Sequence, residues 1–243
     1  MLKKYRNLWV FGDSYSTPGF CVDPADSFWM KVAQELNVDQ VYNYSWPGNS
    51  IDSVAHTLIS DSEQYNWNTD FFLVGIPPLA RLTLVSKDDK NSFHRRVFNL
   101  SAQEIDQELI LCHHGLENIS FHKDPTAIRF EDSTWTEIQA CRTIFLLNQW
   151  LDSKKANYLI LNLSKEFMED VPATGKFLQN HCYEHPNNIL IEDTYYTINL
   201  GINKPVDFET YGWAGHHGSA GNEYFFKKSI LPKLNTMYQN SYA

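Results

Sequence analysis

The sequence has few cysteines and no long hydrophobic run, and both absences limit the kind of protein it encodes. Its 4 cysteines among 243 residues lie far apart with no Cys-x-x-Cys pair, which argues against a zinc site or a disulfide framework. We expect them to be small buried hydrophobes. No stretch approaches the roughly 18 to 20 apolar residues of a membrane-spanning helix. The apolar run behind the basic N-terminus stops at Gly12, too early for a signal peptide.

We therefore expect no membrane span and a soluble protein made in the cytoplasm, with no signal peptide. A virion-associated protein, or one released by lysis, would have the same features. Basic residues are also scarce, with 20 Lys and Arg against 29 Asp and Glu, a formal net charge of -9. The longest basic cluster is 94–96, and no basic stripe exists that would suit a nucleic-acid partner. The sequence gives no sign of an oligomeric state.

The chain also lacks internal repeats, low-complexity tracts and linkers, so we expect one domain over residues 1–243. Its five short apolar runs have the length and continuous character of strands buried on both faces. They cover residues 8–11, 41–44, 71–74, 158–163 and 189–191. Helical patterns lie between them, over residues 27–36, 49–59, from 134 onward, and 222–231 ending at Pro232.

Strands that alternate with helices predict an α/β fold, a three-layer doubly wound sheet of about five parallel strands of the flavodoxin-like type. Residues 87–132 fit this rhythm less well. They are polar, carry a helical pattern over 101–112, and are predicted to be an insertion that covers one rim of the sheet.

Polar turns follow the first three predicted strands. Gly12 to Ser14 follow the first, a turn containing Gly48 and Asn49 follows the second, and Gly75 follows the third. In a parallel sheet these turns meet at one edge, where ligands bind, and glycine lets a main-chain amide approach a ligand closely. The same residues are also ordinary turn chemistry, and an oxyanion role for Gly48 is no better supported than a plain turn.

A glycine-rich loop over residues 212–222 precedes the last predicted helix and contains His216 and His217. A serine becomes a good nucleophile only when a base takes its proton, and histidine has a pKa suited to that role near neutrality. Ser14 and a histidine of this loop therefore form a candidate catalytic pair. The other histidines have no partner at metal-ligand spacing, and we expect no metal and no organic cofactor.

These residues resemble the SGNH (GDSL-type) hydrolase family. The family's first block, a strand followed by Gly-Asp-Ser, is matched by residues 11–16, and its second block is matched by residues 43–50 with Gly48 as its glycine. In the last block the catalytic histidine stands five residues before the glycine that opens the final helix, the spacing of His216 and Gly221. The resemblance implies an SGNH fold, with Ser14 as nucleophile and His216 as base.

The chain departs from the family in two places. The third block normally reads Gly-x-Asn, and here Gly75 is followed by Ile76 and Pro77, which offers no amide donor. We therefore consider Asn49 or Arg81 as a further oxyanion donor. The aspartate that the family places three residues before the histidine is Trp213 here. The group that orients the imidazole then remains open between Asp207, Glu209 and a main-chain carbonyl or water.

The sequence thus predicts a serine esterase that hydrolyses small acyl esters or acylated carbohydrates through an acyl-enzyme. The amides of Ser14 and Gly48 would stabilise the oxyanion, and Asp13 would shape the turn. Aromatic residues near the pocket, among them Tyr15 and Trp46, would stack on a sugar, line an acyl slot or belong to the core. Two alternatives stay open: a non-catalytic binding or virion-associated module that keeps the fold, and an O-acyltransferase.

Overall fold

The structure of the protein is a computed structural model. It describes residues 5–17, 23–46, 49–77, 81–85, 95–99, 133–163, 173–190 and 218–240. Within these ranges, residues 81–85, 95–99, 133–137, 173–174 and 240 are described by their backbone alone.

The central sheet has five parallel strands in the order β2-β1-β3-β6-β7. The strands are β1 (Asn7–Phe11), β2 (Gln40–Asn43), β3 (Asp70–Ile76), β6 (Asn157–Asn162) and β7 (Asn188–Ile189). The predicted α/β fold with a doubly wound sheet is confirmed. In this order the chain changes direction across the sheet between β1 and β3, so the crevice at their carboxyl ends is the expected ligand site.

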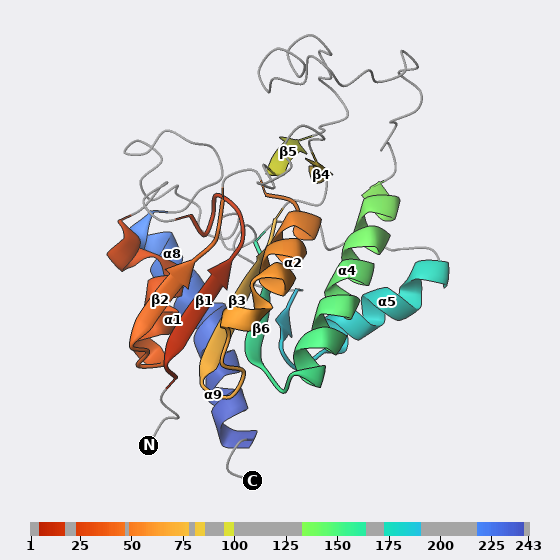
Figure 1. The fold of residues 1–243 in the computed structure, drawn as a ribbon. Helices are drawn as coiled ribbons and strands as arrows, with labels where there is room; N and C mark the ends of the chain where they lie inside the picture. The colour runs from red at the N-terminus through yellow and green to blue at the C-terminus, as the bar shows by residue number, and fades with distance from the viewer. Residues whose placement is uncertain are drawn as a thin grey trace.

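Helices cover both faces of the sheet (Figure 1). One layer contains α2 (Ile51–Ser60), α4 (Ser133–Ser153) and α5 (Ala173–Glu184), and the other contains α1 (Phe28–Glu35), α8 (Ser219–Phe225), η3 (Phe226–Ile230) and α9 (Leu231–Asn240). Alternate residues of β1 enter opposite layers: Trp9 and Phe11 pack with α2 and α4, whereas Leu8 and Val10 pack with α1 and α8. Two-sided burial explains why β1, β3 and β6 read as continuous apolar runs. The expectation of two-sided burial is wrong for β2, which lies at the edge of the sheet and has no fully buried residue.

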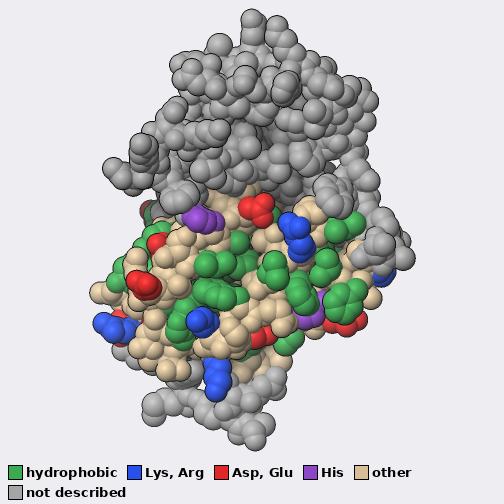
Figure 2. Space-filling model, turned by 45° about the vertical axis from the view of Figure 1, so that its right-hand side comes forward, with side chains coloured by type: hydrophobic (Ala, Val, Ile, Leu, Met, Phe, Trp, Pro, Cys, Tyr) green, Lys and Arg blue, Asp and Glu red, His purple; other side chains and the backbone are tan. Residues whose placement is uncertain are grey.

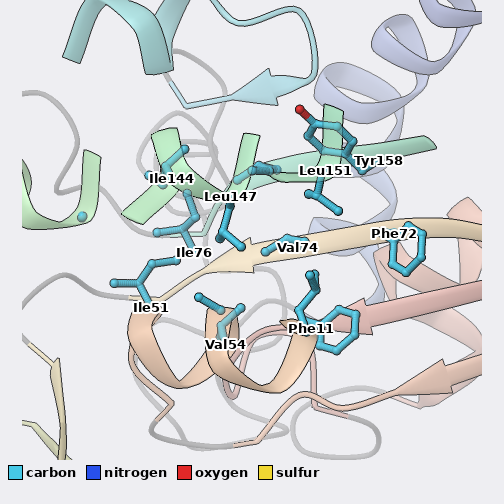
Figure 3. Close-up of a cluster of buried hydrophobic side chains, with 14 of the residues drawn as sticks. Phe11, Ile51, Val54, Phe72, Val74, Ile76, Ile144, Leu147, Leu151 and Tyr158 are labelled. Carbon is cyan, nitrogen blue, oxygen red and sulfur yellow. The ribbon is translucent and has the colours of Figure 1, made fainter. Parts of the chain in front are cut away.

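The layer under α2 and α4 is a dense apolar cluster (Figure 3). Val74 and Ile76 of β3 lie between Val54 of α2 and Leu147 of α4, and these side chains are at most 2% exposed. Burial of each such side chain stabilises the fold by about 1.5–3 kcal/mol. Cys141 and Cys182 are buried here as predicted, while Cys21 and Cys112 lie outside the described residues.

The N-termini of α1 and α2 are capped by serines. The Ser27 Oγ accepts a hydrogen bond from the Met30 amide at 3.4 Å, and the Ser50 Oγ accepts one from the Ser53 amide at 3.2 Å. Each cap satisfies one of the amides that a helix start leaves without a partner. The short turns η1 (Pro24–Asp26) and η2 (Ser62–Gln64) flank these helices.

The prediction that the last helix ends at Pro232 is wrong, because helical structure continues through α9 to Asn240. The turn before the proline, η3, is a π-helical turn in which the Leu231 amide donates to the Phe226 carbonyl, five residues back. This wider turn shifts the hydrogen-bond ladder just ahead of the proline ring, which has no amide to donate and would crowd a regular turn. The helical segment therefore passes through Pro232.

Beyond the sheet edge, β4 (Arg81–Val85) and β5 (Arg95–Asn99) pair antiparallel, and β4 runs beside α2. The sequence analysis did not predict this hairpin. The helical pattern over 101–112 and most of the predicted rim insertion fall outside the described residues. Within the described ranges, no helix is long and apolar enough to cross a membrane. On the face shown in Figure 2, the described Lys and Arg side chains are scattered among acidic and hydrophobic ones.

Candidate active site

Ser14 lies in a tight turn directly after β1, at the carboxyl edge of the sheet. The Asp13 carbonyl accepts hydrogen bonds from the Ser16 amide at 3.0 Å and the Thr17 hydroxyl at 2.9 Å, and the Asp13 Oδ1 accepts one from the Tyr15 amide at 3.2 Å. Asp13 is fully buried and Ser14 is 8% exposed. Asp13 thus closes the turn around Ser14, which agrees with the shaping role expected for it.

Two glycines let β1 and β3 approach this turn. A Cβ on Gly12 would stand 2.8 Å from the Ser16 Oγ, and a Cβ on Gly75 would overlap the Leu163 side chain and stand 3.3 Å from the same Oγ. Gly75 lies inside β3 rather than after it, because the strand continues to Ile76 by pairing with β6. Gly12 therefore makes room for the Ser16 side chain, and Gly75 makes room for Leu163 and for the same Ser16 hydroxyl.

The end of β2 and the loop after it are bonded to the Ser14 turn through two asparagines. Asn49 Nδ2 donates to the Gly12 carbonyl at 2.8 Å, and its Oδ1 accepts from the Ser53 hydroxyl at 3.2 Å. Asn43, the last residue of β2, donates its Nδ2 to the Ser16 carbonyl at 2.8 Å. Both ends of the turn are thus held by the neighbouring strand and the loop after it, which fixes the position of the turn at the sheet edge.

The start of α8 is hydrogen-bonded to η1 and to the first residue of α1, which lies in the same helical layer as α8. Asn222 Oδ1 accepts the Phe28 amide at 3.0 Å, and the Ser219 hydroxyl donates to the Asp26 carboxylate at 2.8 Å. Lys31 of α1 and Glu223 of α8 form an ion pair of 2.6 Å, and hydrogen bonds from Lys227 and from Lys31 lower the pKa of the Glu223 carboxyl. Figure 1 shows α8 at the end of the sheet where the strand arrows point. Gly218 is the first described residue of this last segment. His216 and His217 stand directly before it in the sequence.

The predicted site residues fall into two groups. Ser14, Asn49 and Gly75 lie together at the carboxyl edge of β1, β2 and β3, and Arg81 opens β4, where only its backbone is described. The other four, Gly48, Asp207, Glu209 and His216, lie outside the described residues. No group of three or more His, Cys, Asp or Glu side chains that would hold a metal occurs among the described residues.

Sequence reasoning missed Asn43, which bonds the Ser14 turn, and the bridge from Asn222 to α1. Asn43 belongs to residues 43–50, the match to the family's second block, so its position in the sequence was a usable signal.

Ser45, two residues later, has a buried Oγ with no hydrogen-bond partner in the described structure, and it lies 3.5 Å from the position of a Cβ on Gly12. Of the aromatic residues considered for the pocket, Tyr15 packs partly buried against the α1 layer and Trp46 is 69% exposed.

The sequence matches no protein-family profile and no curated protein. Its structure matches solved structures over nearly the whole chain. LAE5, an alpha/beta hydrolase enzyme from the metagenome of Lake Arreo, Spain, has a TM-score of 0.50 and 12% identity, covering 97% of this chain and 98% of that one. A member of the lipolytic G-D-S-L family from Veillonella parvula has a TM-score of 0.48 and 14% identity, covering 96% and 98%. The five-stranded parallel sheet flanked by helices is the α/β fold that this chain shares with LAE5, the class of fold expected from the sequence.

Proposed function

We propose that this chain is a serine ester hydrolase that works through an acyl-enzyme, with small acyl esters or acylated carbohydrates as its substrates. The Ser14 Oγ attacks the ester carbonyl while His216 takes its proton, and His216 returns that proton to the leaving alcohol. Water then attacks the acyl-serine, again with His216 as base, and releases the acid. The amides of Ser14 and Gly48 stabilise the negative oxygen of each tetrahedral intermediate.

The observation that carries this proposal is the position of Ser14. It follows β1 at the point where the strand order reverses, in a turn held by Asp13 from within, by Asn43 at the end of β2 and by Asn49 from the loop after it. A nucleophile needs such a fixed position, because small displacements of a reacting group cost large factors in rate. A turn that only connected β1 to α1 would not require these bonds from a second loop.

The anchored start of α8 supports His216 as the base. His216 stands two residues before Gly218 in the sequence, and two residues of chain span at most about 7 Å, so the anchored start of α8 limits how far from it a base at His216 can act. The group that orients the imidazole remains a choice between Asp207, Glu209 and a main-chain carbonyl or water.

The third oxyanion donor differs from the family pattern. Asn49 directs its amide to the Gly12 carbonyl, so we assign it to positioning the Ser14 turn. Arg81, at the start of β4 just past Pro77, is then the remaining candidate donor. Gly75 lies inside β3, where its missing side chain leaves space for Leu163 and the Ser16 hydroxyl.

Hydrolysis of p-nitrophenyl acetate tests the proposal. Ser14→Ala and His216→Ala should each abolish turnover, whereas Ser16→Ala, a change in the same turn, should retain most of it. Asp207→Asn and Glu209→Gln test for a third catalytic residue that orients the His216 imidazole. If the activity of either variant falls as far as that of His216→Ala, its acid is that residue, since loss of such an acid costs about 10⁴-fold in rate. Full activity of Ser14→Ala would refute the proposal. A folded wild type without any turnover would favour the non-catalytic module, and ester formation with an added sugar would favour the acyltransferase.

A further inference from the structure

Aromatic side chains occupy every second position along β2 and the residues that follow it. We name Tyr42, Tyr44 and Trp46 the aromatic strip. Pairing with β1 continues past the end of β2, because the Tyr44 amide donates to the Val10 carbonyl at 2.7 Å and the Trp46 amide donates to the Gly12 carbonyl at 3.2 Å. Since side chains alternate between the faces of a strand, the three rings of the strip share one face.

The strip is stacked against the rings of β1. Trp9 and Tyr42 stack with centroids 4.3 Å apart and planes 17° apart, and Phe11 and Tyr44 stack at 5.7 Å and 15°. The Trp9 ring is itself fixed, since its Nε1 donates to the buried Asp70 carboxylate at 2.8 Å. Tyr42 and Tyr44 therefore have their geometry set before any ligand arrives, which lowers the entropy that these two rings lose on binding.

The outer side of the strip is accessible. β2 is the last strand of the sheet among the described residues, so the ring faces turned away from β1 meet no further strand there. Tyr42 is 37% exposed and Trp46 is 69% exposed. Large exposed aromatic groups that lie together on a surface mark a binding site more often than single exposed residues do.

The chemistry around the strip favours a neutral ligand with a flat apolar face and a polar edge. The Tyr42 hydroxyl donates to Gln40 Oε1 at 2.5 Å at the rim of the strip, so hydrogen-bonding groups border the rings. Burial, with the Asp61 carboxylate adding to it, raises the pKa of the Tyr44 phenol, so this ring stays neutral. A nucleobase would also stack, but its phosphates would meet a chain of net charge -9. A pyranose ring has the required face of C–H groups and edge of hydroxyls.

We propose that the aromatic strip binds the sugar rings of a neutral glycan chain and leads its acylated unit to Ser14. From Tyr42 to Trp46 the strip extends about 13 Å, long enough for a few sugar rings in a row. Its inner end is the Trp46 amide, which is bonded to the Gly12 carbonyl two residues before Ser14. The delivery of an ester to Ser14 rests on the proposed hydrolase function, whereas the glycan site itself does not.

Direct binding tests the glycan site without reliance on catalysis. Xylohexaose, cellohexaose and chitohexaose are titrated into the full chain and binding is followed by calorimetry. At least one of them should bind, and Trp46→Ala and Tyr42→Leu should each weaken its affinity about tenfold or more. Phe177→Ala is the matched control, since this residue of α5 is 70% exposed and lies away from the strip, and it should change affinity less than twofold.

The outcomes separate the two proposals. If the protein binds a hexasaccharide through the strip but hydrolyses no ester, the glycan site is supported and the hydrolase proposal is refuted. No binding of any of the three hexasaccharides, or equal affinities of the wild type and both strip variants, would overturn the glycan site whatever the hydrolysis assay shows. Tighter binding of a single-stranded oligothymidylate, lost in Trp46→Ala, would overturn it in favour of a nucleic-acid ligand.

Discussion

Replacing Asn222 with alanine tests whether the last helical segment holds the start of α1. Asn222 is 1% exposed, its Oδ1 accepts the Phe28 amide at 3.0 Å, and its Nδ2 donates to the Gly218 carbonyl at 3.1 Å. Phe28 is the first residue of α1, so its amide has no partner inside the helix. A buried donor left unsatisfied costs about 1–3 kcal/mol, and the second lost bond costs about 1 kcal/mol. We expect the free energy of unfolding to fall by about 2–4 kcal/mol.

Urea denaturation measures this loss, with Asn235→Ala as the control. Asn235 is an exposed asparagine of α9, and its substitution should change the free energy of unfolding by less than about 0.5 kcal/mol. If Asn222→Ala is as mild as this control, the bridge between α8 and α1 does not stabilise the fold as described. Ester hydrolysis by Asn222→Ala should also fall, because the chain that carries His216 loses its anchor.

Three further predictions follow from the contacts of buried groups. Gly12→Ala would place a Cβ 2.8 Å from the Ser16 Oγ, so it should lower ester hydrolysis and reduce the free energy of unfolding by about 1–3 kcal/mol. Adding Ser16→Gly should restore part of both quantities, and the absence of any rescue would contradict the packing argument. Asp70→Ala should cost about 3 kcal/mol or more in urea denaturation, because the buried carboxylate accepts three hydrogen bonds; a loss below about 1 kcal/mol would show that they contribute little. Burial lowers the pKa of His185, with Asp152 opposing, so the unfolded state binds more protons as the pH falls below about 6.5. The wild type should therefore lose more stability between pH 7.5 and pH 5.5 than His185→Gln, and equal losses would refute this assignment.

The strands of the central sheet and the starts of α1 and α2 were predictable from the sequence because their signals are local, unlike the β4–β5 hairpin. The run from Leu8 to Phe11 reads as a buried strand since both faces of β1 are covered, and Ser27 and Ser50 stand directly before the helices they cap. The turn that contains Ser14 was also predictable, because it follows a strand within a recognisable motif. These features need only neighbouring residues to form.

Long-range contacts could not be predicted in the same way. Asn222 caps a helix that begins 194 residues earlier, and nothing in its own surroundings indicates Phe28 as its partner. The passage of the last helical segment through Pro232 depends on a wider turn before it, whereas the proline alone predicts an end. The Asp70 carboxylate likewise meets its partners Asn7 and Trp9 only after β1 and β3 pair.

The most direct measurement of the central claim is covalent labelling with a fluorophosphonate, followed by mass spectrometry of the digested protein. Such a reagent modifies a serine only where a base activates it and oxyanion donors stabilise the product. We predict a single adduct on Ser14 in the wild type, and a strongly reduced adduct in His216→Ala. An unlabelled Ser14 in the folded protein, or an adduct on Ser16 in its place, would contradict the assignment of Ser14 as the nucleophile.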